Sequence, residues 1–325
     1  MSTCRSDPDP SLPAEFALIA RHFRPLAGPG ALDLTDDAAL LTPPVGRELV
    51  LTVDAMVAGV HFLPDDPPDL VGRKLLRVNL SDLAAKGATP LGYLMTVSAP
   101  RATPDAWFAG FAAGLAADQA EFAVTLLGGD TTSTPGPISL SLTAVGHVAP
   151  GRMVRRTGAR AGDGIWVTGT LGDGALGLAV ARKKLADPTG HLLDRYRLPR
   201  PRLGLPIAGI ASAAMDVSDG LVQDLGHLCR AAGLQATVEA PRVPLSDAAR
   251  AAGPDWLASC LTGGDDYELL LAVPPAREAA LRQVAQEAGI PVTRVGSFHP
   301  GAPCLLVHDL AGRQIALDQP GWSHF

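Results

Sequence analysis

Apolar side chains recur at roughly helical spacing between Asp69 and Gly87, which predicts an amphipathic helix over this stretch. Gly87 is typical of the end of a helix. The carboxylate of Asp82 falls inside the apolar pattern. Because burying an ionised carboxylate is costly unless a cation or several donors receive it, Asp82 requires a partner. That partner is either a bound cation or a local donor from Ser81, Asn79 or a backbone amide.

The rest of the first half alternates strands and helices irregularly, which favours a mixed α/β layer. Apolar positions predict a helix over residues 14–23, and the acidic pair in L-T-D-D-A-A-L-L, residues 34–41, leads into an apolar strand. The other expected elements are a strand over 49–53 that ends in Asp54, a strand over 92–97, a helix over 104–119, a strand over 122–127 that runs into G-G-D-T-T at 128–132, and a strand over 138–145. Residues 1–13, rich in Pro and Asp, are expected to form a tail.

A second domain is expected to begin near residue 150, so the predicted domains are 1–150 and 151–325. A polar, Gly-rich connection over 155–164 precedes the strand I-W-V-T-G-T. The further elements predicted are helices over 174–184, 219–232 and 276–288 and strands over 235–239, 268–273, 292–297, 304–307 and 313–317.

Composition narrows the class of protein. The chain has 325 residues, enough for two ordinary domains, and its 47% hydrophobic and 18% charged residues are typical of a folded globular protein. A net charge of −6, without a stripe of Lys and Arg interleaved with aromatics, excludes the usual footprint of nucleic-acid binding. No run of about 18 apolar residues occurs, which argues against a membrane span and favours a cytoplasmic protein. The four cysteines form no C-x-x-C pair and are expected to be free thiols; they are Cys4, Cys229, Cys260 and Cys304.

Two nucleotide-binding motifs bear on the class of protein. No G-x-x-x-x-G-K-[ST] occurs, which excludes a P-loop. Residues 172–177 match G-x-G-x-x-G, and Asp194 follows at the distance of a dinucleotide-binding acid. However, the residues after the following helix contain no second apolar strand to complete a βαβ unit. A tight turn from strand to helix is therefore favoured over dinucleotide binding.

Aspartates recur at predicted strand ends and Gly-rich turns, and they are the strongest chemical signal. They are Asp36, Asp37, Asp54, Asp82, Asp130, Asp216, Asp219, Asp265 and Asp266. A single Asp can cap a turn. Two carboxylates about 4 Å apart repel by about 4 kcal/mol at an effective dielectric of about 20, so a cluster without cations destabilises the fold. Oxygen ligands with no His or Cys cluster favour magnesium or calcium over zinc, and magnesium is commonly shared with substrate phosphates.

Basic and nucleophilic groups add little to this signal. Arg155, Arg156 and Arg160 in the Gly-rich connection are the best placed to contact phosphate, with a solvated charged loop as the alternative. His61, between Val60 and Phe62, has the pattern of a core or rim histidine. No Ser-His-Asp or Cys-His arrangement follows from the spacing.

Seven motifs occur in one order along the chain and carry a family resemblance. They are T-D-D-A-A-L-L at 35–41, T-V-D-A-M-V-A-G-V-H-F at 52–62, V-N-L-S-D-L-A-A-K-G-A-T-P at 78–90, G-G-D-T-T at 128–132, M-D-V-S-D-G-L at 215–221, G-G-D-D-Y-E-L at 263–269 and the terminal G-W-S-H-F. Together they closely resemble the thiamine-monophosphate kinase family of the aminoimidazole ribonucleotide synthetase superfamily. The resemblance extends from Glu15 to Phe325.

The resemblance implies a two-domain α/β fold of the α+β kind and a homodimer in which the N-terminal domains pair their sheets into a shared barrel. It implies an N-terminal domain for ATP, magnesium and dimerisation, and a C-terminal domain that adds nucleotide and substrate contacts. The implied reaction is ATP-dependent, magnesium-dependent phosphorylation of thiamine monophosphate to thiamine diphosphate, the last step of thiamine diphosphate biosynthesis.

The resemblance also assigns roles to residues at the matching motif positions. The implied magnesium ligands are Asp37, Thr52, Asp54, Asp82, Asp130, Asp216 and Asp219. Asp82, Asp130 and Asp219 carry the magnesium-assisted catalysis. The implied nucleotide contacts are Gly129, Asp130, Arg156 and Ser218, and the implied substrate contacts are His61, Asp265 and Trp322. Trp322 can stack on a cationic aromatic ring, and a C-terminal anchor packed on the domain surface is the alternative.

Two positions depart from the family pattern. Thr35 replaces the usual Gly before the first acidic pair, which changes the turn without removing the ligand. Asp265 replaces the usual Glu and is one methylene shorter, which lengthens its substrate contact or leaves room for a bridging water.

Three alternatives to this function are compared. Aminoimidazole ribonucleotide synthetase and selenophosphate synthetase share the superfamily, but the latter typically uses a reactive Cys or selenocysteine near its N-terminus, and the Pro-rich surroundings of Cys4 lack that context. A nucleotide-binding scaffold without catalysis has no need for so many carboxylates.

The chemistry of the implied substrate predicts a mechanism. A phosphate monoester has a second pKa of about 6 and is mostly dianionic at neutral pH, so its attacking oxygen needs no general base. Direct in-line transfer without a phosphoenzyme is expected.

Overall fold

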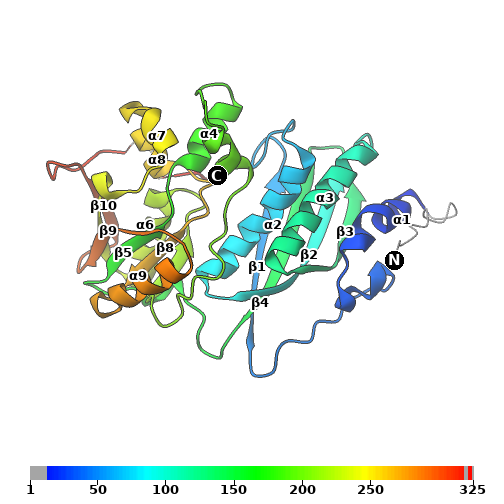
Figure 1. Ribbon diagram of the computed structural model, residues 1–325, viewed down its shortest axis with the longest axis horizontal. Coiled ribbons are helices and arrows are strands. Elements are labelled where there is room, and N and C mark those ends of the chain that lie inside the picture. Colours follow the sequence, from blue (N-terminus) through cyan, green and yellow to red (C-terminus); the bar gives the residue numbers. More distant parts are fainter. Residues whose placement is uncertain (1–12, 318–320, 324–325) are drawn as a thin grey trace. The chain divides into compact units, whose positions relative to one another are not determined.

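The computed structural model of the chain (Figure 1) describes residues 13–317 and 321–323. Almost all of the predicted tail, Cys4 included, and the last two residues of the terminal motif lie outside the described residues. The chain forms two compact units. The N-terminal unit comprises the chain up to Asn79 together with Pro90–His147, and the C-terminal unit comprises Leu80–Thr89 and the chain from Val148 onward. The second half of the predicted 69–87 helix therefore belongs to the C-terminal unit.

The N-terminal unit is built on a four-stranded sheet with two long helices on one face (Figure 1). Its strands are β1 (Glu48–Val57), β2 (Thr89–Ala99), β3 (Thr125–Ser133) and β4 (Ser139–Val148), in the order β1-β4-β2-β3. Strands β2 and β3 are parallel. The helices are α2 (Pro68–Ala85) and α3 (Asp105–Phe122), and the short α1 (Ala14–Leu18) continues as a π-helical turn.

Small residues allow α2 and α3 to approach closely. A Cβ at Gly114 of α3 would lie 1.9 Å from the carbonyl oxygen of Asp69, and a Cβ at Gly72 of α2 would lie 2.4 Å from that of Phe111. Both helices therefore need glycine at the crossing. The predicted end of α2 is confirmed, since Gly87 has a φ of +66° and follows the last helical turn.

The C-terminal unit is built on a six-stranded mixed sheet. Its strands are β5 (Gly164–Thr168), β6 (Ala213–Asp216), β7 (Gln235–Glu239), β8 (Leu269–Val273), β9 (Val292–His299) and β10 (Cys304–His308), in the order β10-β7-β9-β5-β8-β6. Only the β10–β7 pair is parallel among the pairs β5–β8, β5–β9, β6–β8, β7–β9 and β10–β7. The helices are α4 (Asp173–Ala181), α5 (His191–Arg197), α6 (Leu221–Ala232), α7 (Asp247–Ala251), α8 (Leu257–Thr262) and α9 (Glu278–Glu287).

Strands β5 and β8 are neighbouring interior strands of this sheet and are buried along their whole length. Side chains alternate between the two faces of a strand. Accordingly, Ile165 and Leu270 belong to a core that includes α6, whereas Trp166 and Leu271 belong to a second core that includes Leu281 of α9. Figure 1 shows α6 and α9 in this unit together with its sheet. Burial on both faces explains the nearly continuous apolar runs that predicted these strands.

The G-x-G-x-x-G stretch forms a tight turn at the start of α4. Gly172 has a φ of +87° and directly precedes the helix. The strand before it, β5, is flanked by two antiparallel strands, so no parallel βαβ unit is present. The residues that follow α4 form the helix α5, which sequence reasoning missed, and a Cβ at Gly177 would lie 2.0 Å from the carbonyl oxygen of Leu192 in α5.

The strand predicted within 34–41 is absent from the described residues. Residues 32–34 have left-handed φ angles of 50–57°, which turn the chain away from an extended conformation. Leu40 is 70% exposed, and its amide donates to the carbonyl of Gly30 rather than to a neighbouring strand. The apolar run therefore lacks a ladder partner in the single chain.

Three further boundaries differ from the predictions. Strand β1 continues to Val57, so Asp54 lies inside the strand and not at its end. The G-G-D-T-T motif forms the second half of β3 instead of a turn after it. The strand predicted over 313–317 is reduced to a single bridge between His308 and Gln314, because the Asp309 carboxylate accepts two amide hydrogen bonds that close a tight turn. Sequence reasoning also missed β6.

Two smaller findings bear on the expected class of protein. Among the described residues, Cys229, Cys260 and Cys304 are free thiols, as predicted. None of the helices in the described part of the chain is both long and apolar enough to cross a membrane.

Candidate functional site

The end of α2 is joined to strand β6 by two side chains. The Ser81 hydroxyl donates to the Asp216 carboxylate at 2.6 Å, and the Lys86 ammonium donates to the carbonyl of Ala214 at 2.8 Å. Asp82 lies between these two side chains in the sequence and is half-buried. Two of the predicted metal ligands, Asp82 and Asp216, are therefore carried by elements that are bonded to each other.

The electrostatics of Lys86 identify its neighbours. Burial lowers the pKa of its ammonium group, and the positive charge of Arg156 lowers it further. The Asp216 and Asp82 carboxylates act in the opposite direction. Arg156, which is predicted to contact the nucleotide, therefore lies within electrostatic range of Lys86. The Asp82 and Asp216 carboxylates lie within range of the same ammonium group.

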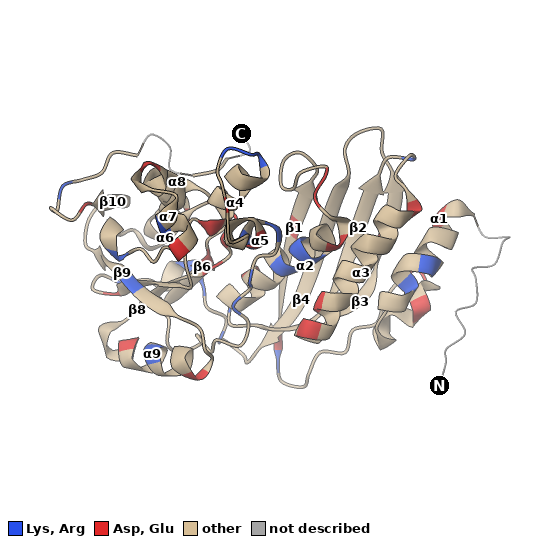
Figure 2. Ribbon diagram, turned by 45° about the horizontal axis from the view of Figure 1, so that its top comes forward, with Lys and Arg blue, Asp and Glu red and all other residues tan. Residues whose placement is uncertain are grey.

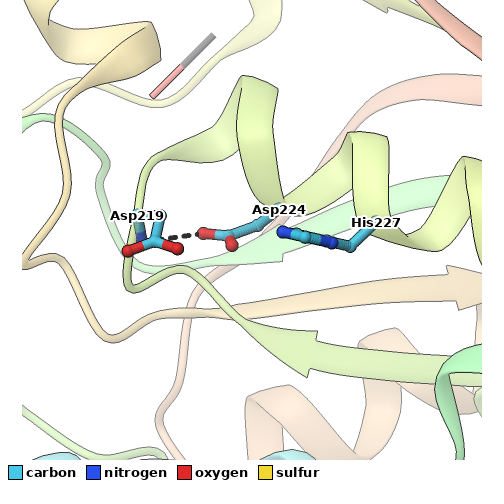
Figure 3. A group of neighbouring side chains, drawn as sticks. All are labelled: Asp219, Asp224 and His227. Carbon is cyan, nitrogen blue, oxygen red and sulfur yellow. Dashed lines mark hydrogen bonds between the residues drawn. The ribbon is translucent and has the colours of Figure 1, made fainter. Parts of the chain in front are cut away.

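The loop after β6 turns sharply around a buried carboxylate. The amides of Ser218, Asp219 and Gly220 donate to a single oxygen of Asp224, at 3.0, 3.0 and 3.1 Å. Figure 3 shows the bond between Asp219 and Asp224. Asp224 lies on α6 and is 1% exposed. Burial, and then the nearby Asp219 and Asp216 carboxylates, raise its pKa to about 8. Three acidic side chains, those of Asp216, Asp219 and Asp224, therefore lie within electrostatic range at this end of β6.

A candidate set of metal ligands lies on the same loop and helix. Asp219, Asp224 and His227 each offer one ligand atom, and these atoms lie within 4.8 Å of one another (Figure 3). Burial and the charges of Arg230 and Arg156 lower the pKa of His227, which favours the neutral imidazole. The Nδ1 atom of that ring pairs with Arg230 at 3.0 Å.

The G-G-D-D-Y-E motif lies beside this loop. The amide of Asp265 donates to the carbonyl of Ser218 at 2.9 Å, and that of Tyr267 donates to the carbonyl of Val217 at 2.8 Å. Asp265 adopts a left-handed φ of +70°. The amide of Trp322 donates to the carbonyl of Asp219 at 3.1 Å. Two of the three predicted substrate residues thus lie next to a predicted metal ligand.

The second acid of the motif has a structural role. The Asp266 carboxylate accepts the amides of Gly172 and Gly174 at 2.7 and 3.0 Å and fixes the turn that begins α4. Its burial raises its pKa to about 8. Glu268 is fully buried and binds Arg195, Arg202 and the Thr168 hydroxyl.

The N-terminal unit holds a second group of predicted site residues around an open cavity of about 280 Å³. Asp37, Gly129 and Asp130 line this cavity. The Gly129 position excludes any side chain, because a Cβ there would lie 1.8 Å from the Met95 carbonyl oxygen of the parallel strand β2. Apolar side chains of α1 and β2 complete the lining.

The remaining predicted residues lie on or after β1. Thr52 and Asp54 share one face of this strand with the buried Val50 and Met56. The amide of Asp54 donates to the Asn79 side chain at 3.1 Å.

His61 is half-buried, and its Nδ1 atom accepts the amide of Val57 at 2.9 Å. The Lys74 ammonium donates to the carbonyl oxygen of His61 at 3.1 Å. The Val57 amide therefore holds the ring of His61, and Lys74 holds its backbone, whether or not the residue meets a substrate.

The structure therefore divides the predicted residues into sets. Within the C-terminal unit it brings together Asp82, Arg156, Asp216, Ser218, Asp219, Asp265 and Trp322. Within the N-terminal unit, Asp37, Gly129 and Asp130 line the cavity. Thr52 and Asp54 lie on β1, and His61 follows that strand. Sequence reasoning missed Lys86 and Asp224. The sequence feature that could have identified Asp224 is its position as an acidic residue in the first turn of the helix that follows S-D-G.

Comparison with known proteins defines the class first. The family model "AIR synthase related protein, N-terminal domain" matches residues 35–148, and "AIR synthase related protein, C-terminal domain" matches residues 160–302. With its two units of mixed α/β structure, the chain is a two-domain AIR synthase related protein.

Individual relatives that match most of the chain define the particular family. The chain is 45% identical to thiamine-monophosphate kinase of Caulobacter vibrioides, over 96% of this chain and 91% of the relative. The crystal structure of thiamine-monophosphate kinase from Stenotrophomonas maltophilia superposes with a TM-score of 0.81 at 40% identity, covering 93% of this chain and 98% of the other. A complex of AaThiL with AMPPCP and TMP superposes with a TM-score of 0.76 at 30% identity, covering 89% and 91%. The chain belongs to the thiamine-monophosphate kinase family.

Proposed function

We propose that the chain is an ATP-dependent phosphotransferase that converts thiamine monophosphate and ATP to thiamine diphosphate and ADP. The observation that carries this proposal is the 45% identity to a thiamine-monophosphate kinase over 96% of the chain. The relative AaThiL binds AMPPCP and TMP together, which supports a site for both substrates. The arrangement of Ser218, Asp219 and Asp265 on adjacent segments of the C-terminal unit fits this activity.

The carboxylates are proposed to hold magnesium. The donor set fits this ion, because Asp216 and Asp219 offer hard oxygen ligands, and after burial their negative charges help to raise the pKa of the neighbouring Asp224. The proposed ligands are Asp82, Asp216 and Asp219 in the C-terminal unit and Asp37, Thr52, Asp54 and Asp130 in the N-terminal unit. Bound magnesium would supply charge neutralisation for the phosphates and the transferred group.

The chain's own residues bind and orient the two substrates in this proposal. Ser218, Gly129 and Arg156 contact the nucleotide, and Arg156 adds positive charge beside an otherwise acidic loop. His61, Asp265 and Trp322 contact the thiamine part, where the half-exposed indole of Trp322 can stack on a cationic ring for about 0.5–2 kcal/mol. The acceptor phosphate is mostly dianionic at neutral pH, so the transfer is in line and needs neither a general base nor a phosphoenzyme.

A direct assay tests the function. Purified protein with ATP, magnesium and thiamine monophosphate is expected to form thiamine diphosphate and ADP in equal amounts, and chelation of magnesium by excess EDTA is expected to stop both. Chromatography of quenched samples measures the two products. ADP without thiamine diphosphate would indicate a different acceptor and contradict the proposal, as would the absence of any nucleotide turnover.

We also propose a homodimer in which the N-terminal sheets of two chains pair into a barrel. One face of the edge strand β1 carries Leu49, Leu51 and Val53, which are 41%, 63% and 61% exposed. Adjacent exposed apolar side chains on a sheet are typical of a protein interface. Figure 2 shows Lys and Arg spread over several elements of both units and not gathered along one element, as is common in proteins that bind nucleic acid. A cytoplasmic location is part of the same proposal.

The dimer proposal predicts that a charged side chain on the exposed apolar face of β1 will weaken the dimer. Leu51→Glu is expected to shift the protein from dimer to monomer, because each interface would then bury a carboxylate against apolar side chains. Light scattering coupled to size-exclusion chromatography measures the mass. Arg47→Glu, at an exposed position just before β1, is the control and is expected to leave the dimer intact. A monomeric wild-type chain, or a dimeric Leu51→Glu variant, would contradict the proposed interface.

A further inference from the structure

The amides of the loop after β6 form a concave site for one anionic atom. Ser218, Asp219 and Gly220 are consecutive, and their three amides converge on a single oxygen atom. Consecutive backbone amides in such a turn form a nest, which in many proteins binds a phosphate oxygen. Here the nest is filled from within the chain, by the carboxylate of Asp224 (Figure 3). These amides are therefore engaged by Asp224 and not directed at a ligand.

The opposite edge of the loop is held by other bonds. The carbonyls of Val217 and Ser218 accept amides from Tyr267 and Asp265. Gly220 has a φ of +118°, and a Cβ there would lie 2.6 Å from the carbonyl oxygen of Thr262. The loop is thus fixed along its carbonyl edge by the D-D-Y-E segment and along its amide edge by Asp224.

We propose that Asp224 is a positioning residue that sets the backbone of the Ser218–Gly220 loop, so that the Ser218 hydroxyl and the Asp219 carboxylate are presented in the geometry that binds magnesium and nucleotide. This inference rests on the proposed kinase function and gives Asp224 a role different from that of a metal ligand. Asp224 acts through the backbone that it holds. Its 1% exposure leaves it little access to a substrate.

The neighbouring residue on α6 holds the same loop from its exposed side. The Gln223 side chain donates to the Asp219 carboxylate at 3.1 Å and also to the carbonyl of Trp322. The first turns of α6 therefore contact both the loop and the segment that carries the C-terminal tryptophan. Because Asp224 bonds only backbone amides of the loop, its loss should alter metal and nucleotide binding before substrate binding.

The experiment compares Asp224→Ala with Asp224→Asn, since Asn keeps one oxygen that can accept the three amides. Two readouts are used: amide hydrogen exchange of residues 218–220, and the magnesium concentration that gives half-maximal kinase activity. In the Ala variant we expect exchange at these amides to accelerate at least about tenfold and the half-saturating magnesium concentration to rise about 10–100-fold, with the KM for thiamine monophosphate within about twofold of wild type. The Asn variant is expected to keep most of the protection and to shift magnesium dependence less than about threefold.

A destabilised control separates positioning from general loss of structure. Leu228 lies on the same helix, is 0% exposed and packs in the core, so Leu228→Ala is expected to lower the melting temperature without changing the magnesium dependence. The inference is overturned if Asp224→Ala leaves either exchange or magnesium dependence at the wild-type value, or if Leu228→Ala reproduces the magnesium shift.

Failure of the proposed kinase function can be distinguished from failure of the proposed role of Asp224. If the wild-type chain forms no thiamine diphosphate, the kinase proposal fails, while hydrogen exchange and calorimetric titration with magnesium and ATP still report on the loop. Weaker magnesium–ATP binding by Asp224→Ala than by wild type then supports the positioning role, and equal binding or no binding by the wild type overturns it.

Discussion

Asp82→Asn is expected to lower kcat for thiamine monophosphate phosphorylation by about 10²–10³-fold while the chain stays folded. Asp82 lies between Ser81 and Lys86, whose side chains bind Asp216 and the β6 backbone, so its position is fixed relative to a second proposed ligand. Asn preserves the volume of the side chain but removes the charge that attracts magnesium. Initial rates over a magnesium titration, with circular dichroism to verify folding, measure the effect.

The matched control lies on the same helix. Asp69 is in the first turn of α2 and is exposed, so Asp69→Asn removes the same charge without touching a proposed ligand set. We expect its kcat to stay within about twofold of wild type, because an exposed charge contributes little. Asp82→Asn with wild-type kcat and unchanged magnesium dependence would remove Asp82 from the proposed ligands.

The acidic residues of the site could be predicted from the sequence because their signal is local. A carboxylate inside an apolar pattern, as at Asp82, implies a partner wherever the fold places it. The identity of the neighbours could not be predicted in this way. Ser81 and Asp216 are far apart in the chain, and only the packing of the end of α2 against β6 brings them to 2.6 Å.

Asp224 shows a different limit. It is close in sequence to the loop that it holds, but an acidic residue near a helix start is common and usually only complements the helix dipole. Nothing in the sequence distinguishes that ordinary role from a side chain that accepts three amides at once. The distinction depends on the sharp turn at Gly220, which becomes visible only in the structure.

The sequence predicts a strand well where both faces of the strand are buried. It predicts a strand poorly where an apolar run has no neighbouring strand to pair with. Strands β5 and β8 are buried on both faces, so their apolar runs identified them. The same criterion predicts a strand for the apolar run that ends at Leu41, but Leu40 is 70% exposed and pairs with no strand in the described part of the chain. An apolar pattern predicts that a surface will be buried. It does not predict whether a strand of the same chain buries it.

Asp118→Asn is expected to lower the free energy of unfolding of the N-terminal unit by about 3–5 kcal/mol. Asp118 is 0% exposed on α3 and binds the buried Arg77 of α2 through two bonds of 2.6 and 2.9 Å and Arg73 through one of 2.7 Å. The large effect arises because the substitution removes the fully buried negative charge that faces the Arg77 guanidinium, which is itself only 4% exposed. Urea unfolding followed by circular dichroism measures the change.

Glu121 provides the control for this pair, since it contacts the same two arginines. Its carboxylate bonds Arg77 at 2.6 Å and Arg73 at 3.0 Å, but its side chain is 48% exposed. Glu121→Gln is therefore expected to cost less than about 1 kcal/mol, because solvent screens the exposed charge and can replace its bonds. If the two variants were equally destabilised, the contribution of Asp118 would come from hydrogen-bond geometry common to both acids and not from neutralising a buried cation. If neither were destabilised, the contact between α2 and α3 would depend on the close glycine crossing at Gly72 and Gly114 rather than on this ion pair.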